Sequence, residues 1–201
     1  MPLPDSPTRT ELHIRRIELR GYCRGDGLYE IDGRVVDTKT YSVRHYGSDE
    51  ETAAGAPIHD MWIRLVIDEE LVVKDLLAVM DASPFRVCRE AVAPMAQIIG
   101  ERIKPGWTNM VKERLGGATG CTHLMELLIP LATAAYQTLG SARIQRPNVI
   151  AKAGVPAKID SCYAYASHRD VVKRCWPAFY TGALSNPGKQ EGTSNAKSNG
   201  K

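Results

Sequence analysis

The sequence predicts one α+β domain, in which a four-stranded antiparallel sheet is followed by helices packed on one of its faces. Two observations lead to this prediction. Alternating apolar residues mark two pairs of strands before residue 80, and three- and four-residue spacing of apolar residues marks helices after residue 83. A chain that runs through its strands first and its helices afterwards is typical of this architecture.

The four predicted strands form two hairpins and cover residues 12–22, 28–36, 61–67 and 71–79. The turn 25–27 (Gly-Asp-Gly) joins the first two strands, because glycine adopts a positive φ without steric cost. Ile63, Leu65 and Ile67 alternate along the third strand and therefore point to one face of the sheet. The polar turn 68–70 leads into the fourth strand.

Three helical segments are predicted after the sheet, over residues 88–99, 108–116 and 122–139. The first contains Pro94, and a proline inside a helix costs about 3 kcal/mol unless it sits at a kink. Thr108 is the expected N-cap of the second segment, and Gly140 is the expected end of the third. The third segment has the clearest buried stripe, which consists of Leu124, Leu128, Leu131, Ala135 and Leu139.

The domain is expected to have flexible ends. Residues 1–10 are predicted to form a flexible arm, and residues 11–183 form the single domain. Within it, residues 145–183 are rich in proline, tyrosine and tryptophan and are expected to be an ordered C-terminal extension. Residues 184–201 contain almost no large apolar side chain, so they cannot offset the entropy of ordering and are predicted to be disordered.

Composition argues against several classes of partner. The net charge is only +3 and basic residues are mixed with acidic ones, so we expect no nucleic-acid partner. No apolar run approaches the roughly 20 residues that cross a bilayer, so no membrane partner is expected. The five cysteines have irregular spacing without a CxxC motif, which favours reduced thiols and a cytoplasmic location. The sequence leaves both a monomer and a homodimer open.

The first candidate for chemistry is the glycine-rich segment 116–126, which leads into the third helix at Cys121, Thr122 and His123. The N–H groups of a first helical turn lack intrahelical partners, so they bind anionic oxygens well. His123 and Glu126 are three residues apart and share a face that is not the leucine stripe. This pattern indicates either a polar cluster in a cleft or an ordinary helix start with a surface His–Glu pair.

The second candidate is the dipeptide His59-Asp60, immediately before the third strand. A histidine oriented by a carboxylate is suited to acid–base chemistry near neutral pH. Asp81 ends the fourth strand and therefore lies at the same end of the hairpin. The alternative interpretations are a loop residue beside a strand and an ordinary N-cap of the following helix.

The two candidates form one site if the third helix begins next to the open end of the second hairpin. Such a site contains His59, Asp60, Asp81, Cys121, His123 and Glu126. Trp62 and Tyr163 would add aromatic surface for a substrate, although packing in the core is the commoner role of such residues. Histidine, cysteine and carboxylate groups at one place could ligate zinc or iron, or act without a metal.

Several motifs give the chain a specific resemblance to a bacterial family, the domain-of-unknown-function family 2889. The resemblance covers residues 12 to about 182. Its motifs include Arg15-Arg16-Ile-Glu, Asp37-Thr-Lys, Ile58-His-Asp-Met-Trp62, Asp81-Ala-Ser-Pro, Pro105-Gly-Trp and Gly120-Cys-Thr-His-Leu-Met-Glu. The resemblance implies a small cofactor-independent enzyme of bacterial aromatic catabolism, including that of lignin-derived dimers.

A second resemblance concerns the fold alone. Residues 59–136 are similar in layout to IscU/NifU-type iron–sulfur scaffold proteins, which have a hairpin with a ligand at each end and a cysteine at the start of a late helix. Cys121 would match that cysteine, and His59 would match the early carboxylate ligand. The second scaffold cysteine would fall near Ser83, where the chain has no cysteine. This departure argues against cluster assembly.

Together with the candidate residues, the resemblance to family 2889 implies a cofactor-independent carbon–carbon lyase that acts on a phenolic aromatic substrate, such as a lignin-derived one, by decarboxylation or loss of formaldehyde. His59 is the expected base and Asp60 its orienting carboxylate, while His123 with Glu126 returns the proton. Cys121 is expected to help hold an oxyanion. Asp81, Trp62 and Tyr163 are expected to bind the substrate.

Two alternatives stay open. The chain could be a metal- or iron–sulfur-carrying binding protein, whose ligands would then be His59, Asp81, Cys121 and His123. It could also be a non-catalytic binder of a small ligand, which would show saturable binding without a product.

Overall fold

The structure is a computed structural model that describes residues 7–47, 49–144, 156 and 158–182. It forms two compact units, Met1–Gln145 and Arg146–Lys201. The predicted tail, 184–201, and most of the predicted arm lie outside the described residues. The first unit contains the sheet and the long helices, and with them both segments of the candidate site.

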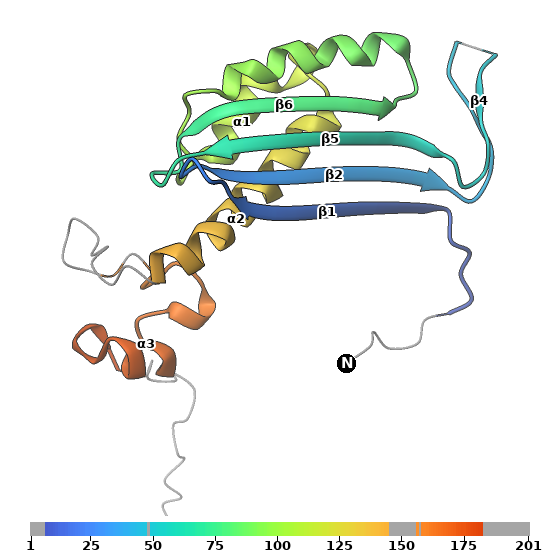
Figure 1. The fold of residues 1–201 in the computed structure, drawn as a ribbon. Helices are drawn as coiled ribbons and strands as arrows, with labels where there is room; N and C mark the ends of the chain where they lie inside the picture. Colours follow the sequence, from blue (N-terminus) through green and yellow to red (C-terminus); the bar gives the residue numbers. More distant parts are fainter. Residues whose placement is uncertain (1–6, 48, 145–155, 157, 183–201) are drawn as a thin grey trace, which may run out of the picture. The chain divides into compact units, whose positions relative to one another are not determined.

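The first unit is built on an antiparallel sheet with the strand order β1-β2-β5-β6 (Figure 1). Its four strands are β1 (His13–Cys23), β2 (Tyr29–Lys39), β5 (Pro57–Ile67) and β6 (Val73–Ala82). Between β2 and β5, a separate small hairpin consists of β3 (Val43–Arg44) and β4 (Glu51–Thr52). The predicted α+β class and the four-stranded sheet are therefore confirmed.

The strands around the candidate site are longer than the sequence predicted. β2 continues to Lys39 and β5 begins at Pro57, and their paired residues include Asp37 and His59. His59 and Asp60 thus lie inside a strand and not before it. The prediction missed this segment because polar residues interrupt the alternation of apolar side chains there, while the ladder of backbone hydrogen bonds continues.

Helices from residues 86–144 cover one face of the sheet (Figure 1). They are the 3-10 helix η1 (Arg86–Ile98), α1 (Trp107–Leu115), the 3-10 turn η2 (Gly117–Thr119) and α2 (Thr122–Ile144). α2 carries the predicted stripe, whose members are all buried: Leu124, Leu128, Leu131, Ala135 and Leu139. The stripe packs in one core with alternate strand side chains, among them Ile31, Val35, Met61, Ile63 and Leu65. No helix in the described part of the chain is long and apolar enough to span a membrane.

Two helix ends differ from the predicted ones. α1 begins after Gly106, whose φ of 93° favours glycine, and the carbonyl of Gly106 accepts the N–H of Met110. Gly106, and not Thr108, is therefore the N-cap. α2 continues through Gly140 to Ile144, because a glycine inside a helix costs only about 1 kcal/mol and does not have to end it.

The second unit contains short helices in its described residues, 156 and 158–182. They are η3 (Tyr163–Tyr165), α3 (Asp170–Cys175) and η4 (Pro177–Phe179). The ring of Tyr165 packs edge-on against Trp176, with ring centroids 5.8 Å apart. The sequence predicted residues 145–183 as an ordered extension of one domain; residues 145–155, 157 and 183 lie outside the described residues, and this extension stays a prediction.

α2 approaches β1 so closely that only glycine fits at residue 21. A Cβ atom on Gly21 would lie 1.8 Å from Oγ1 of Thr138 and 2.8 Å from its Cβ, so the helix would have to move. We expect Gly21→Ala to lower the free energy of unfolding by about 1–3 kcal/mol, the usual cost of overpacking. Chemical denaturation measures this loss. Gly25→Ala is the matched control, because nothing lies within 4 Å of its Cβ position. Equal stability of the two variants would contradict the predicted clash.

Candidate functional site

The candidate site is centred on the carboxylate of Asp37, near the end of β2. This side chain is only 4% exposed, and it accepts hydrogen bonds from the neighbouring strand β1. Arg15 donates from Nε to Oδ1 and from Nη2 to Oδ2, each over 2.8 Å, and Nε2 of His13 lies 2.8 Å from Oδ1. The antiparallel register places Arg15 directly opposite Asp37. Asp37 is thus a buried anion whose charge is compensated by a side chain of the adjacent strand.

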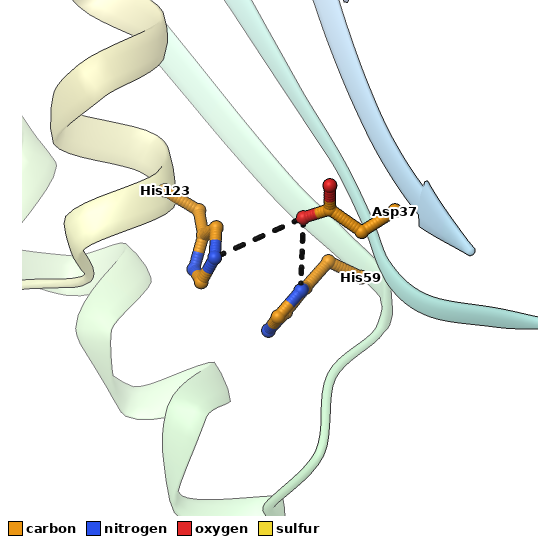
Figure 2. A group of neighbouring side chains, drawn as sticks. All are labelled: Asp37, His59 and His123. Atoms are coloured by element: carbon orange, nitrogen blue, oxygen red, sulfur yellow. Dashed lines mark hydrogen bonds and ion pairs between the residues drawn. The ribbon is translucent and has the colours of Figure 1, made fainter. Parts of the chain in front are cut away.

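Two imidazoles complete the cluster (Figure 2). His59 lies opposite Asp37 on β5, and its Nδ1 is 3.1 Å from Oδ2 of Asp37. His123 comes from the first turn of α2, and its Nε2 is 3.8 Å from the same oxygen. The centroids of the two imidazole rings are 3.8 Å apart. The second hairpin and the start of the long helix therefore meet, and they bring His59 and His123 together.

Burial and neighbouring charges shift the pKa values in the cluster. Burial raises the pKa of Asp37, but hydrogen bonds from Arg15 and His13 and the charge of Arg15 outweigh it and hold this pKa well below its usual range. Burial, then His123, lower the pKa of His59 more than Asp37 raises it. Burial and Arg15 lower the pKa of His123, while Asp37 and Glu126 partly oppose them. At neutral pH, the cluster thus holds an ionised carboxylate beside two uncharged imidazoles.

Cys121 and Glu126 lie at the edge of the cluster. Sγ of Cys121 is 3.9 Å from Nδ1 of His123, and the carbonyl of Cys121 accepts the N–H of Met125 at the start of α2. The side chain of Glu126 is 51% exposed, and its Oε2 lies 3.4 Å from Nη1 of Arg15. Glu126 therefore forms an ion pair with Arg15, whereas the sequence had suggested His123 as its partner.

Three predicted site residues lie on the opposite face of the sheet. Successive side chains of a strand point to opposite faces, so Asp60 points away from the helices when His59 points toward them. Asp60 accepts hydrogen bonds from Nε and Nη2 of Arg34, over 2.8 and 2.6 Å. On the same face, the indole N–H of Trp62 donates to Asp81 over 3.1 Å. Asp60, Trp62 and Asp81 therefore do not join the imidazole cluster.

Asp37 takes the orienting position that the sequence assigned to Asp60. Sequence reasoning missed Asp37 and its partners His13 and Arg15 as site residues. One signal was present, because Asp37 lies two residues after Val35 and so continues the core-facing positions of β2. A carboxylate at such a position needs a buried partner. Its partners could be identified only once the register between β1 and β2 was known.

Tyr163 belongs to the second unit and is 77% exposed. The guanidinium of Arg169 lies 4.0 Å from the centre of its ring, a cation–π contact within the same unit. The predicted contact between Tyr163 and a substrate stays a prediction.

The arrangement of the cluster is suited to two kinds of chemistry. Two uncharged imidazoles, one of them hydrogen-bonded to a carboxylate, can take and return protons near neutral pH. One ligand atom each of Asp37, His59 and His123 also lies within 4.8 Å of the other two, a spacing at which they could hold a metal ion. The imidazoles are 16% and 25% exposed, so a ligand from solvent can reach both of them.

Comparison with known proteins identifies a family without a known function. The family described as "Protein of unknown function (DUF2889)" matches residues 13–137, which include every residue of the Asp37 cluster. No curated protein and no solved structure matches the chain significantly, so the layout predicted from IscU/NifU-type proteins is not confirmed. Because the match covers more than half of the chain, the chain belongs to the DUF2889 family.

Proposed function

We propose that the chain is a cofactor-independent carbon–carbon lyase that releases carbon dioxide or formaldehyde from a phenolic aromatic compound. The observation that best supports this proposal is the close pair of imidazoles, with centroids 3.8 Å apart and planes tilted by 32°, beside one buried carboxylate. Decarboxylation and loss of formaldehyde both need a group that takes a proton and a group that returns one. The cluster offers one imidazole for each task.

His59 is the proposed base. An ionised carboxylate can only accept hydrogen bonds, so Nδ1 of His59 carries the proton in its 3.1 Å contact with Asp37. The lone pair of the ring is then on Nε2, which takes a proton from the substrate. Asp37 stabilises the imidazolium that forms.

His123 is the proposed proton-returning group. After His59 removes a hydroxyl or carboxyl proton, the carbon–carbon bond breaks and its electron pair stays on the carbon of the aromatic product. Carbon dioxide or formaldehyde leaves, and His123 relays the proton from His59 to that carbon. Asp37 and Glu126 favour the protonated form of His123 during this transfer, because their negative charges oppose the effects of burial and Arg15 on its pKa.

The proposed substrate class rests on the resemblance of the sequence motifs to family 2889, which implies a role in aromatic catabolism. It does not rest on the cluster itself. Cys121 lies next to His123 at the start of α2, and its neighbouring N–H groups are the proposed binding site for an oxyanion. We propose a cytoplasmic location, with a small aromatic compound and neither a nucleic acid nor a membrane as the partner. The five cysteines, all of them described, are free thiols and agree with that location.

We expect His59→Ala and His123→Ala each to lower turnover by at least about 100-fold while the protein stays folded, because each removes an acid–base group. The assay incubates the protein with a panel of phenolic monomers and dimers and uses mass spectrometry to detect loss of carbon dioxide or formaldehyde. His45→Ala is the control, since His45 bonds to Thr52 in the β3–β4 hairpin, outside the cluster. Near wild-type rates in both cluster variants would remove the proposal.

We expect Asp37→Asn to lower both turnover and stability, because an amide carries no charge to pair with Arg15 or to hold the tautomer of His59. Loss of a hydrogen bond between charged groups costs about 1.5–3 kcal/mol. Asp60→Asn is the matched control, because it breaks an Asp–Arg pair of the same kind on the opposite face. It should lose stability and keep turnover. Loss of turnover in Asp60→Asn alone would reassign the orienting role to Asp60.

The stability loss in Asp37→Asn should depend on pH. The carboxyl has a lowered pKa in the folded protein, so its stabilising effect is complete above the unfolded pKa of about 3.9. This effect is lost as the pH falls through the lower folded value. The difference in free energy of unfolding between wild type and variant should therefore be full at neutral pH and shrink in acid. Urea denaturation at a series of pH values measures it, and a constant difference would show that the charge of Asp37 is not its source.

A further inference from the structure

We propose that Asp37, His59 and His123 bind one divalent transition-metal ion, such as Zn²⁺ or Fe²⁺. Two histidines and one carboxylate form a ligand set that is common for both ions. The three side chains come from β2, β5 and α2, and one ligand atom of each lies within 4.8 Å of the other two (Figure 2). Within the part of the chain that the structure describes, no other trio of histidine, cysteine or acidic side chains is placed in this way.

The distances in the cluster fit a shared ion better than a complete set of hydrogen bonds. Nε2 of His123 lies 3.8 Å from Oδ2 of Asp37, which is too long for a hydrogen bond. Around a tetrahedral ion with bonds of about 2.0–2.2 Å, ligand atoms lie about 3.3–3.6 Å apart. The two nitrogen–oxygen distances in the cluster, 3.1 and 3.8 Å, lie on either side of that value. Both nitrogen–oxygen distances are thus within a few tenths of an ångström of the spacing around such an ion, and all three ligand atoms lie within 4.8 Å of one another.

The surrounding residues hold Asp37 in the orientation that a metal ligand needs. Its Oδ1 accepts hydrogen bonds from His13 and from Nε of Arg15, each over 2.8 Å, so Oδ2 is directed toward the two imidazoles. Hydrogen bonds to the outer oxygen of a ligating carboxylate fix its orientation and contribute to metal affinity. All three ligands lie on strands or a helix, which position ligand atoms more precisely than loops do.

The charge of Arg15 opposes a cation at this place, and two features compensate for it. Nη2 of Arg15 donates to Oδ2 over 2.8 Å, but a carboxylate oxygen has lone pairs for both this hydrogen bond and a metal. Glu126 lies 3.4 Å from Nη1 of the same guanidinium and offsets its charge. The charge of Asp37 is then left to balance the ion.

This inference goes beyond the proposed lyase and does not depend on it. Three protein ligands leave at least one coordination position for water or for an oxygen atom of a ligand, as in catalytic zinc sites. A bound ion would take the ring nitrogens of His59 and His123 and displace the proton from Nδ1 of His59. The base and relay roles proposed above therefore belong to the metal-free protein, and turnover measured with and without chelator tests them separately from metal binding.

The test is a titration of the full-length, chelator-treated protein with Co²⁺, followed by visible absorption, and with Zn²⁺, followed by calorimetry. We expect one equivalent of each ion to bind. His59→Ala and His123→Ala should each weaken binding by at least about 100-fold, more than the loss of a second-shell group usually does. Circular dichroism checks that the variants are folded, and His59→Gln and His123→Gln serve if an alanine variant is not.

Three further variants test whether other residues of the chain ligate the metal instead. Cys121→Ser and Asp81→Asn remove residues of the ligand set predicted from the sequence, and His45→Ala removes a histidine outside the cluster. All three should bind metal as the wild type does. Absence of saturation at one equivalent, wild-type affinity in the His59 and His123 variants, or loss of binding in the Asp81 or Cys121 variant would overturn the proposal.

Discussion

The ion pair between Asp37 and Arg15 is the interaction on which the rest of the site depends. A carboxylate that is only 4% exposed carries a large desolvation penalty unless it is paired. Arg15 contacts both of its oxygens from the neighbouring strand, and this two-point contact fixes the plane of the carboxylate. Oδ2 then points toward the imidazoles of His59 and His123, whose nearest nitrogens lie 3.1 and 3.8 Å from it. β1 is an edge strand of the sheet, yet it is as much a part of the site as the helix that carries His123.

Packing far from the site sets the position of α2 and therefore of His123. The leucine stripe fills the core along the helix, and glycines in β1 and β2 let the helix lie directly on the sheet. A Cβ atom on Gly33, for example, would be 3.0 Å from Cδ2 of Leu131. Leu124, the residue directly after His123, is itself buried in this core, so the packing of the stripe also places the first turn of α2. His123 can therefore stand 3.8 Å from Asp37 without a hydrogen bond between them, which leaves its ring nitrogen for a substrate or an ion.

The sequence predicts those parts of the fold in which apolar side chains repeat, and it predicts the polar site only in part. The hairpins and the leucine stripe of α2 follow from periodicity. The meeting of His59 and His123 was expected only on the condition that this helix begins next to the open end of the second hairpin. Asp37 could not be found in this way, because it acts through a strand register that extends beyond the last apolar residue of β2. Asp60 was a reasonable partner for His59 by adjacency alone. Within a strand, however, adjacent residues point to opposite faces, so the neighbour in sequence is the residue least able to share a site.

The acid–base role and the metal site make opposite demands on one atom, Nδ1 of His59. As a base, His59 keeps a proton on Nδ1 and donates it to Asp37 over 3.1 Å, whereas as a ligand it gives this proton up. Both roles use the same buried carboxylate and the same two partly exposed imidazoles. The chemistry of the site is therefore decided by whether a proton or a metal ion occupies Nδ1 of His59. With the proton in place, the two rings can relay a proton to the substrate, whereas an ion would bridge the 3.8 Å gap between Oδ2 of Asp37 and Nε2 of His123.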